Sequence, residues 1–365
     1  MKIIIHIGMP KTGSTAIQRA LANSREKLIS AGVLYPENIE PFGTQVKHLL
    51  YKTLLCQGDA EQWRGLPDAQ AKIEKSYGKD VNFFAIWLDD LKSQIRLANP
   101  QTLLISEESF FAAFSKRNTA LHANLQRLLS ELGVNTEDLE LVGYLRSPPD
   151  YYLSSCQQGL KGKSILKDIN RANYFPALKR IRKTYKALHT IFPFDRNIFP
   201  DGDIVKHFSN HVAGIEIESQ GMPNETISGP AMSILQDYRA IYHPENGSRG
   251  NPRQVKALIE SLREAGQRLG LDRPSLKEEV KAFVWKSLGE NLDWLKKNYA
   301  IEFDKSSSGE SNNAELQIQS FKPTKVSDIL DIDEKKKYRL LLEVLFVQTS
   351  SEKKKTKADT ERARN

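Results

Sequence analysis

The first thirty residues constrain the fold of this chain more than any other part. Residues 3–7 (IIIHI) form a β-branched run that is too short for a helix and is typical of a buried strand. A Gly-containing turn over residues 8–15 (GMPKTGST) follows at once, and apolar residues then recur at helical spacing over residues 17–28. Gly32 is a natural helix end. The opening unit is therefore predicted to be strand, loop and helix.

Later segments repeat this alternation. Residues 103–105 (LLI) and 139–145 (LELVGYL) are typical of buried strands, and leucines at helical spacing over residues 121–132 predict a helix between them. A further helix is predicted over residues 175–188, and a short strand within residues 196–205. Strands that alternate with helices imply a parallel sheet, so the predicted fold class is α/β.

The chain is expected to have three parts. Residues 1–220 would form the catalytic core, because they contain the alternating strands and helices. Residues 221–304 have a helical pattern and would form a helical extension. Residues 305–365 begin with a polar, apolar-free stretch and are predicted to be a linker followed by a basic C-terminal tail.

Composition indicates a soluble chain with an anionic partner. Hydrophobic residues make up 39% and charged residues 27%, which excludes whole-chain disorder. No apolar run approaches the roughly 18–20 residues of a membrane span, and the first apolar stretch is too short for a signal peptide, so a cytoplasmic protein is expected. The net charge of +8 favours a nucleic acid, an anionic membrane, an anionic glycan or a phosphate-bearing cofactor. The basic tail leaves a peripheral contact with an anionic surface open.

The turn over residues 8–15 is a predicted phosphate site, because backbone N–H groups and the positive end of a helix meet there. It differs from the nucleoside-triphosphate P-loop, in which the lysine follows the second glycine, since Lys11 precedes Gly13. The dinucleotide pattern G-x-G-x-x-G is also absent from it. A second polar element follows the strand over residues 139–145, where Arg146 precedes Ser154 by eight positions.

These two elements, in this order, resemble those of sulfotransferases that use 3′-phosphoadenosine-5′-phosphosulfate (PAPS). The resemblance implies a P-loop-type three-layer fold with a central parallel sheet, here with a C-terminal helical extension. It implies that Arg146 and Ser154 grip the 3′-phosphate of PAPS. It also implies that the first loop holds the 5′-phosphosulfate through Pro10, Lys11, Thr12, Gly13, Ser14 and Thr15.

The same resemblance implies sulfuryl transfer from PAPS to a hydroxyl or amine of a glycan, glycolipid or similar acceptor. Lys11 would stabilise the negative charge that grows on the bridging oxygen. The acceptor needs a general base, and Glu108, Glu107 and His48 are the candidates, with Glu108 preferred. Glu107 and Glu108 follow the strand at residues 103–105, and adjacent residues on an extended segment point to opposite sides.

Two other classes of function remain as alternatives. A P-loop kinase-like phosphotransferase would use a similar strand, loop and helix, although the position of Lys11 argues against it. A non-catalytic polyanion-binding protein on the same fold would use the basic charge itself, and would bind in a salt-sensitive manner. No specific nucleic-acid partner is expected, and neither the two cysteines nor the histidines have the spacing of a metal site.

Overall fold

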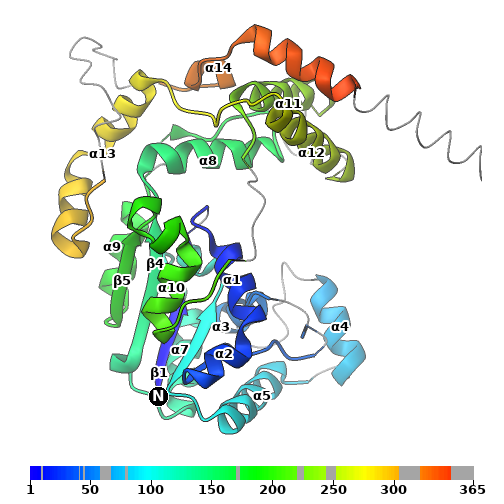
Figure 1. Cartoon of the computed structure of the whole chain (residues 1–365). Coiled ribbons are helices and arrows are strands. Elements are labelled where there is room, and N and C mark those ends of the chain that lie inside the picture. Colours follow the sequence, from blue (N-terminus) through cyan, green and yellow to red (C-terminus); the bar gives the residue numbers. More distant parts are fainter. Residues whose placement is uncertain are drawn as a thin grey trace, which may run out of the picture. The chain divides into compact units, whose positions relative to one another are not determined.

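A computed structural model describes residues 1–9, 11–40, 42–43, 46–57, 67–78, 81–169, 173–219, 226–243, 252–303 and 321–346 (Figure 1). The chain forms two compact units, of which the first comprises Met1–Ser147, Tyr174–Met222 and Asn291–Phe303. The second comprises Pro148–Asn173, Pro223–Glu290 and Asp304–Asn365. The change of unit at Met222 lies close to the predicted boundary at residue 220. The segment Pro148–Asn173, by contrast, belongs to the second unit although it lies within the predicted core.

The first unit contains an all-parallel sheet of five strands in the order β2-β3-β1-β4-β5. The strands are β1 (Lys2–His6), β2 (Val33–Leu34), β3 (Thr102–Ser106), β4 (Leu139–Leu145) and β5 (Leu188–Pro193). In the central strand, His6 lies in register with Ser106 of β3 and with Val142 of β4. The predicted α/β class with a central parallel sheet is confirmed, and the carboxyl ends of β1, β3 and β4 lie side by side.

Helices connect these strands, as a parallel sheet requires. The helices of the first unit are α1 (Ser14–Asn23), α2 (Arg25–Ser30), α3 (Leu49–Gln57), α4 (Pro67–Tyr77), α5 (Phe83–Ala98), α6 (Phe110–Phe114), α7 (Thr119–Glu131), α9 (Phe175–Thr184), α10 (Ile204–Ala213) and the last part of α13 (Glu278–Tyr299), from Asn291 on. Figure 1 places α1, α2 and α10 on one side of the sheet and α7 on the other. This arrangement is that of a three-layer α/β fold.

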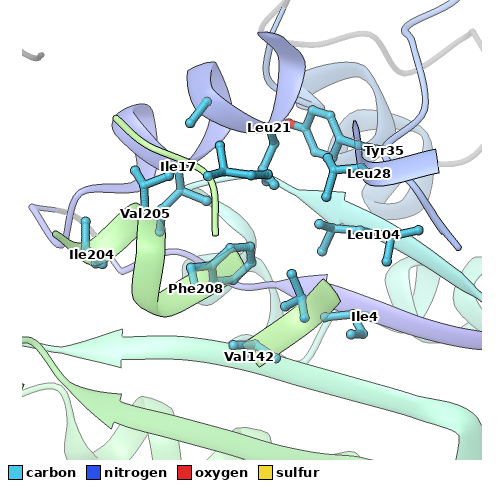
Figure 2. Packing of buried hydrophobic residues seen from close by; sticks show 14 of the residues in the cluster. Ile4, Ile17, Leu21, Leu28, Tyr35, Leu104, Val142, Ile204, Val205 and Phe208 are labelled. Carbon is cyan, nitrogen blue, oxygen red and sulfur yellow. The ribbon is translucent and has the colours of Figure 1, made fainter. Parts of the chain in front are cut away.

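The core on the α1 side of the sheet is built from alternate strand residues. Ile4, Leu104 and Val142 come from three adjacent strands and are all buried. They lie on one face of the sheet, because every second side chain of a strand points to the same face. Figure 2 shows side chains of α1 and α10 packed over them, including Leu21 and Phe208. Burial of each such side chain contributes about 1.5–3 kcal/mol to stability. This packing fixes the start of α1 against the sheet.

Three sequence-based expectations for local structure are wrong. The strand predicted within residues 196–205 is instead a pair of short 3-10 turns, Arg196–Ile198 and Pro200–Gly202, followed by α10. The fifth strand lies earlier, at Leu188–Pro193, and α9 ends at Thr184. The helix predicted over residues 175–188 therefore ends before the position where the strand begins. The helix expected over residues 17–28 is broken at Ser24, whose φ of −118° is not helical, into α1 and α2.

The second unit is helical. Its helices are α8 (Pro148–Leu160), α11 (Gly229–Tyr242), α12 (Pro252–Arg268), the first part of α13 (Glu278–Tyr299), α14 (Val326–Ile329) and a helix over residues 334–346. Residues 221–304, predicted as a helical extension, contain α11, α12 and α13, but Asn291–Phe303 belong to the first unit, and helices also occur within the predicted linker and tail. In the described part of the chain, no helix is long and apolar enough to cross a membrane.

Candidate functional site

The loop between β1 and α1 follows a tightly fixed path. Lys11 and Gly13 have left-handed φ values of 69° and 76°, and this conformation costs a non-glycine residue such as Lys11 about 1–2 kcal/mol. Thr12 is fully buried, and its hydroxyl donates a hydrogen bond of 2.6 Å to the carbonyl of Met9. This hydrogen bond links the two sides of the turn, from Thr12 back to Met9. Pro10 lies outside the described residues.

Gly8 marks a close approach between this loop and the end of β3. A Cβ atom at Gly8 would collide with Oγ of Ser14 and lie 3.1 Å from Cα of Glu108. Only glycine fits there without a shift of neighbouring backbone. Ser14 at the start of α1 and Glu108 after β3 therefore both lie against Gly8.

The N-terminus of α1 is open to an anion. Gly13 is the N-cap and provides no side-chain cap, and the first turn of the helix contains no acidic residue. Ser14 is nine-tenths buried or more, and among the described residues its Oγ has no hydrogen-bond partner. A helix start with uncapped N–H groups and a buried hydroxyl without a partner is suited to phosphate or sulfate oxygens.

Arg146 directly follows β4 and reaches the same loop. Its Nη1 donates a hydrogen bond to the carbonyl oxygen of Lys11 over 3.4 Å. The guanidinium lies over the ring of Phe194, 5.6 Å from its centre, and the carbonyl of Arg146 accepts a hydrogen bond of 2.9 Å from the hydroxyl of Tyr174. The loop and Arg146, which were predicted separately from the sequence, thus meet at the carboxyl end of the sheet. Neither Phe194 nor Tyr174 was expected there, because nothing in the spacing of either residue connects it to Arg146.

Ser154 is placed differently from the other residues of the predicted site. It lies on α8, half-buried, and α8 belongs to the second compact unit. Its role beside Arg146 stays a prediction. Thr15, the last residue of the predicted loop, is exposed in the first turn of α1.

The two candidate glutamates after β3 have different surroundings. Glu107 is 3% exposed, and its Oε1 accepts hydrogen bonds from the backbone N–H (3.2 Å) and the hydroxyl (2.8 Å) of Ser109. Its amide also donates to the carbonyl of His6 over 3.3 Å. Glu108 is half-buried, beside Gly8. The partial exposure of Glu108 suits a group that meets an acceptor, whereas Glu107 is tied into the structure.

His48 is packed inside the first unit. Its ring lies between those of Tyr35 and Tyr51, at centroid distances of 4.4 and 4.5 Å, and it is fully buried. Nδ1 accepts a hydrogen bond of 2.9 Å from the N–H of Ser106, and Nε2 lies 3.0 Å from the carbonyl of Pro36. Burial lowers the pKa of His48 to about 3. With both ring nitrogens engaged, this histidine is better suited to holding the end of β3 than to accepting a proton from a substrate.

Ser106 and His6 complete a buried polar chain that the sequence did not reveal. Nδ1 of His6 lies 2.7 Å from Oγ of Ser106, and Gln18 of α1 also donates to that oxygen over 3.4 Å. Burial lowers the pKa of His6 to about 3, so its ring is neutral. The in-register pairing of His6 with Ser106 is the signal for this contact, but it depends on knowing which strands are neighbours.

The site therefore contains a phosphate-type loop, an arginine and a carboxylate around the ends of three adjacent strands. Within the described ranges, no group of three or more His, Cys, Asp or Glu residues is placed to hold a metal ion. Comparisons of the chain with protein-family models, with curated proteins and with solved structures find no match.

Proposed function

We propose that this chain is a PAPS-dependent sulfotransferase with a P-loop-type fold. It would move the sulfuryl group from PAPS to a hydroxyl or amine of a glycan, glycolipid or similar acceptor. Ligands of open parallel sheets bind outside the carboxyl ends of the strands, and that is where the candidate residues of the first unit lie.

The observation that carries this proposal is the hydrogen bond between Arg146 and the carbonyl of Lys11. It joins the loop predicted to hold the 5′-phosphosulfate to the arginine predicted to bind the 3′-phosphate. A nucleotide that carries phosphates on the 5′ and 3′ positions of one ribose would need both elements close together, within the distance between those two phosphates. The planar guanidinium suits a phosphate because it donates two parallel hydrogen bonds to two oxygens.

The loop itself fits a phosphosulfate group. Ser14 supplies a buried hydroxyl without a partner among the described residues, and the start of α1 supplies N–H groups with no side-chain cap. Gly8 lets the loop backbone lie against that hydroxyl, because a Cβ atom there would collide with it. Both features favour an anion that approaches the backbone closely.

The proposed residue roles follow from the charge changes of sulfuryl transfer. The acceptor oxygen forms a bond to sulfur while the bond from sulfur to the bridging phosphate oxygen breaks, and adenosine 3′,5′-bisphosphate leaves with the bonding electron pair. Lys11 and the N–H groups of the loop stabilise the charge on that oxygen. Glu108 takes the acceptor proton. Atoms and charge balance without a metal ion or a redox partner.

The proposal also includes a small-molecule donor, an acceptor of the glycan or glycolipid class, and a cytoplasmic location. The net charge of +8 suits both an anionic donor and an acidic acceptor. Acceptor choice depends on loops that surround the site, and these differ among proteins that share a fold.

The decisive experiment is calorimetric titration of the full chain with adenosine 3′,5′-bisphosphate, with ATP and AMP as controls and without magnesium. We expect the bisphosphate to bind at least about tenfold more tightly than AMP, because Arg146 adds charge-assisted hydrogen bonds to the 3′-phosphate. Preferential binding of ATP would favour the phosphotransferase alternative. Binding of none of the three, together with salt-sensitive binding of polyanions, would favour a polyanion-binding protein.

A further inference from the structure

The exposed side of α9 in the first unit is strongly basic. The helix turns its apolar residues inward, since Phe175, Leu178 and Ile181 are all buried. Residues three and four positions apart share a side of a helix, so the positions between these three point outward. Four cations occupy the outward positions and are all exposed, namely Lys179, Arg180, Arg182 and Lys183. We call these four residues the basic side of α9.

Acidic residues do not neutralise the basic side from within its own segment. The sequence contains no Asp or Glu between Asp168 and Asp195, so neither α9 nor β5 has an acidic residue. In the part of the chain that the structure describes, none of the four cations forms an ion pair with a carboxylate. The positive charge of the basic side is therefore available to a ligand.

The elements next to α9 also leave this charge in place. α6 contains no acidic residue, and the last part of α13 has two acids, Asp293 and Glu302, that are balanced by two bases, Lys296 and Lys297. Of these, Glu302 pairs with Lys296 at 2.8 Å. Glu140 of β4 pairs in register with Leu188, and two positions earlier stand Asp138 and Lys186. Because Asp138 and its neighbour Glu137 lie toward Lys186, that lysine is not counted in the basic side.

The basic side adjoins the candidate site at two places. Tyr174, the residue before α9, donates the 2.9 Å hydrogen bond to the carbonyl of Arg146. α6 begins two residues after Glu108 and packs against α9, where the ring centre of Phe114 lies 4.8 Å from that of Tyr185. A ligand that reaches from Glu108 over α6 would therefore meet α9 next.

Contacts within the first unit hold three of the four cations in position. Nζ of Lys179 donates a hydrogen bond of 2.9 Å to Oδ1 of Asn291 and lies over the ring of Trp294. Arg182 lies over the ring of Tyr299, 5.4 Å from its centre. Arg180 donates to the carbonyl of Ser115, directly after α6, over 3.0 Å. Neutral partners position these cations without cancelling their charge, which reduces the entropy that is lost when a ligand binds.

We propose that the basic side of α9 binds the anionic groups of an acidic polysaccharide, and that such a chain is the acceptor presented to Glu108. A helix of ten residues is about 15 Å long, so its cations reach along several sugar residues of one chain. Arginine and lysine bind anionic oxygens through charge-assisted hydrogen bonds. The inference rests on the proposed function, because the sulfotransferase site is what makes a glycan the expected ligand.

Two other anionic ligands fit the basic side less well. Single-stranded nucleic acids bind by stacking bases on exposed aromatic rings. Here Phe175 and Tyr185 are buried, while Lys179 and Arg182 lie over the two rings of α13. A bilayer requires several exposed apolar side chains, and among residues 174–193 the one large apolar side chain that is exposed is Leu188.

The test is calorimetric titration of the full chain with a heparin octasaccharide as the acidic probe. Controls are a neutral maltooctaose, an oligouridine of eight nucleotides, a short DNA duplex, and vesicles of equal parts phosphatidylcholine and phosphatidylglycerol. We expect the octasaccharide to bind at least about tenfold more tightly than any control. Raising the salt from about 0.1 M to about 1 M shortens the Debye length from about 10 Å to about 3 Å, and should weaken that binding.

A pair of charge reversals separates the basic side from the net charge. Lys179→Glu/Lys183→Glu should weaken octasaccharide binding about tenfold or more, because like charges across an interface oppose association. The matched control is Lys335→Glu/Arg339→Glu, which also changes two exposed cations four positions apart on a helix and alters the net charge equally. These cations lie close in sequence to Asp331, Asp333 and Glu334, and their reversal should leave octasaccharide binding within about twofold.

Two further measurements guard against a folding defect. Lys179→Arg/Lys183→Arg keeps both charges and should bind the octasaccharide within about twofold of the unmodified chain. Circular dichroism and titration with adenosine 3′,5′-bisphosphate should give the same results for the reversal variant as for the unmodified chain. Where the double reversal does not fold, Lys179→Gln/Lys183→Gln replaces it, with a smaller expected loss of about threefold or more.

The outcomes distinguish this inference from the proposed function. Loss of octasaccharide binding in the α9 variant alone, with bisphosphate binding intact, would support both. The same loss without bisphosphate binding by any variant would support the polysaccharide surface and overturn the sulfotransferase proposal. Equal losses in the α9 variant and its control, or no loss in either, would overturn the inference and leave the proposed function standing. Tighter binding of a nucleic acid or of vesicles through the same lysines would overturn it as well.

Discussion

The backbone N–H of Ser106 donates a hydrogen bond of 2.9 Å to Nδ1 of His48. This contact fixes the proton of the His48 ring on Nε2, which faces the carbonyl of Pro36 at 3.0 Å. The amide of His48 in turn donates to the carbonyl of Ser106 over 3.1 Å. The end of β3, directly before Glu107 and Glu108, is thus held by a neutral imidazole.

A first prediction concerns stability and pH. Burial lowers the pKa of both His6 and His48 to about 3, while each would titrate near 6.5 in the unfolded chain. Between these values the unfolded chain binds more protons than the folded one, so stability falls as pH falls from 6.5 toward 3. Each histidine contributes a slope of about 1.4 kcal/mol per pH unit within that window. Urea unfolding between pH 7 and pH 5 measures it.

The variant His48→Gln should reduce the slope of the unfolding free energy against pH by the contribution of one histidine. His122→Gln is the matched control, because His122 is exposed and should leave the slope unchanged. A slope that is the same in His48→Gln and in the unmodified chain would contradict a neutral, buried His48. If His48 were the general base, His48→Gln would also remove the acidic limb of the rate profile.

The sequence predicted the fold where local patterns are strong. The β-branched run before Gly8 and the leucine spacing of α7 each indicated one structure, and both elements formed as predicted. The fifth strand was missed because residues 175–188 continue a helical pattern past the point where Tyr185 leaves α9 with a ψ of 119°. Pairing with β4 makes that segment a strand. Such pairing depends on tertiary structure, which the hydrophobic periodicity of one segment does not report.

The candidate site was predictable where its residues follow strands directly. The loop after β1, the pair Glu107 and Glu108, and Arg146 all lie at strand ends, and parallel strands bring those ends to one edge. The burial of His48 and the contact of Arg146 with Phe194 were not predictable, because both depend on side-chain packing between elements far apart in sequence.

A second prediction tests the close approach at Gly8. Gly8→Ala would drive a methyl group into Oγ of Ser14 and to 3.1 Å from Cα of Glu108, and such overpacking costs about 1–3 kcal/mol. We expect the affinity for adenosine 3′,5′-bisphosphate to fall about tenfold or more, measured by calorimetry. Gly162→Ala is the control, since the nearest atom to a Cβ there is a carbonyl 3.8 Å away. Equal affinities of the two variants would contradict the tight loop.

A third prediction separates two roles of Arg146. Arg146→Ala should weaken binding of the bisphosphate about tenfold to a hundredfold, because charge-assisted hydrogen bonds contribute about 1.5–3 kcal/mol. AMP, which lacks the 3′-phosphate, should bind nearly as before. Equal losses for both nucleotides would mean that Arg146 acts by holding the carbonyl of Lys11 rather than by binding phosphate. Arg117→Ala changes an exposed arginine and serves as the control.

A fourth prediction concerns the choice between the two glutamates. Glu108→Gln should lower the rate of sulfuryl transfer about 10²- to 10⁴-fold, the usual contribution of a general base. Glu107→Gln should instead lower stability by about 1–3 kcal/mol, because the two hydrogen bonds that Ser109 donates to Oε1 of Glu107 would no longer be charge-assisted. Release of adenosine 3′,5′-bisphosphate from PAPS measures the rate, and thermal unfolding measures the stability. A larger rate loss in Glu107→Gln would reverse the assignment.

A fifth prediction concerns Lys11, whose backbone conformation and proposed charge can be tested apart. Lys11→Ala keeps the costly positive φ of 69° but removes the ammonium group, so turnover should fall about 10²- to 10³-fold while bisphosphate affinity changes little. Lys11→Gly also removes the charge but tolerates this φ, so it should be about 1 kcal/mol more stable than Lys11→Ala at a similar turnover. Stopped-flow measurement of bisphosphate release, with Lys116→Ala as an exposed control, gives the rates. Unchanged turnover in both variants would exclude Lys11 from the chemical step and leave it a structural residue of the loop.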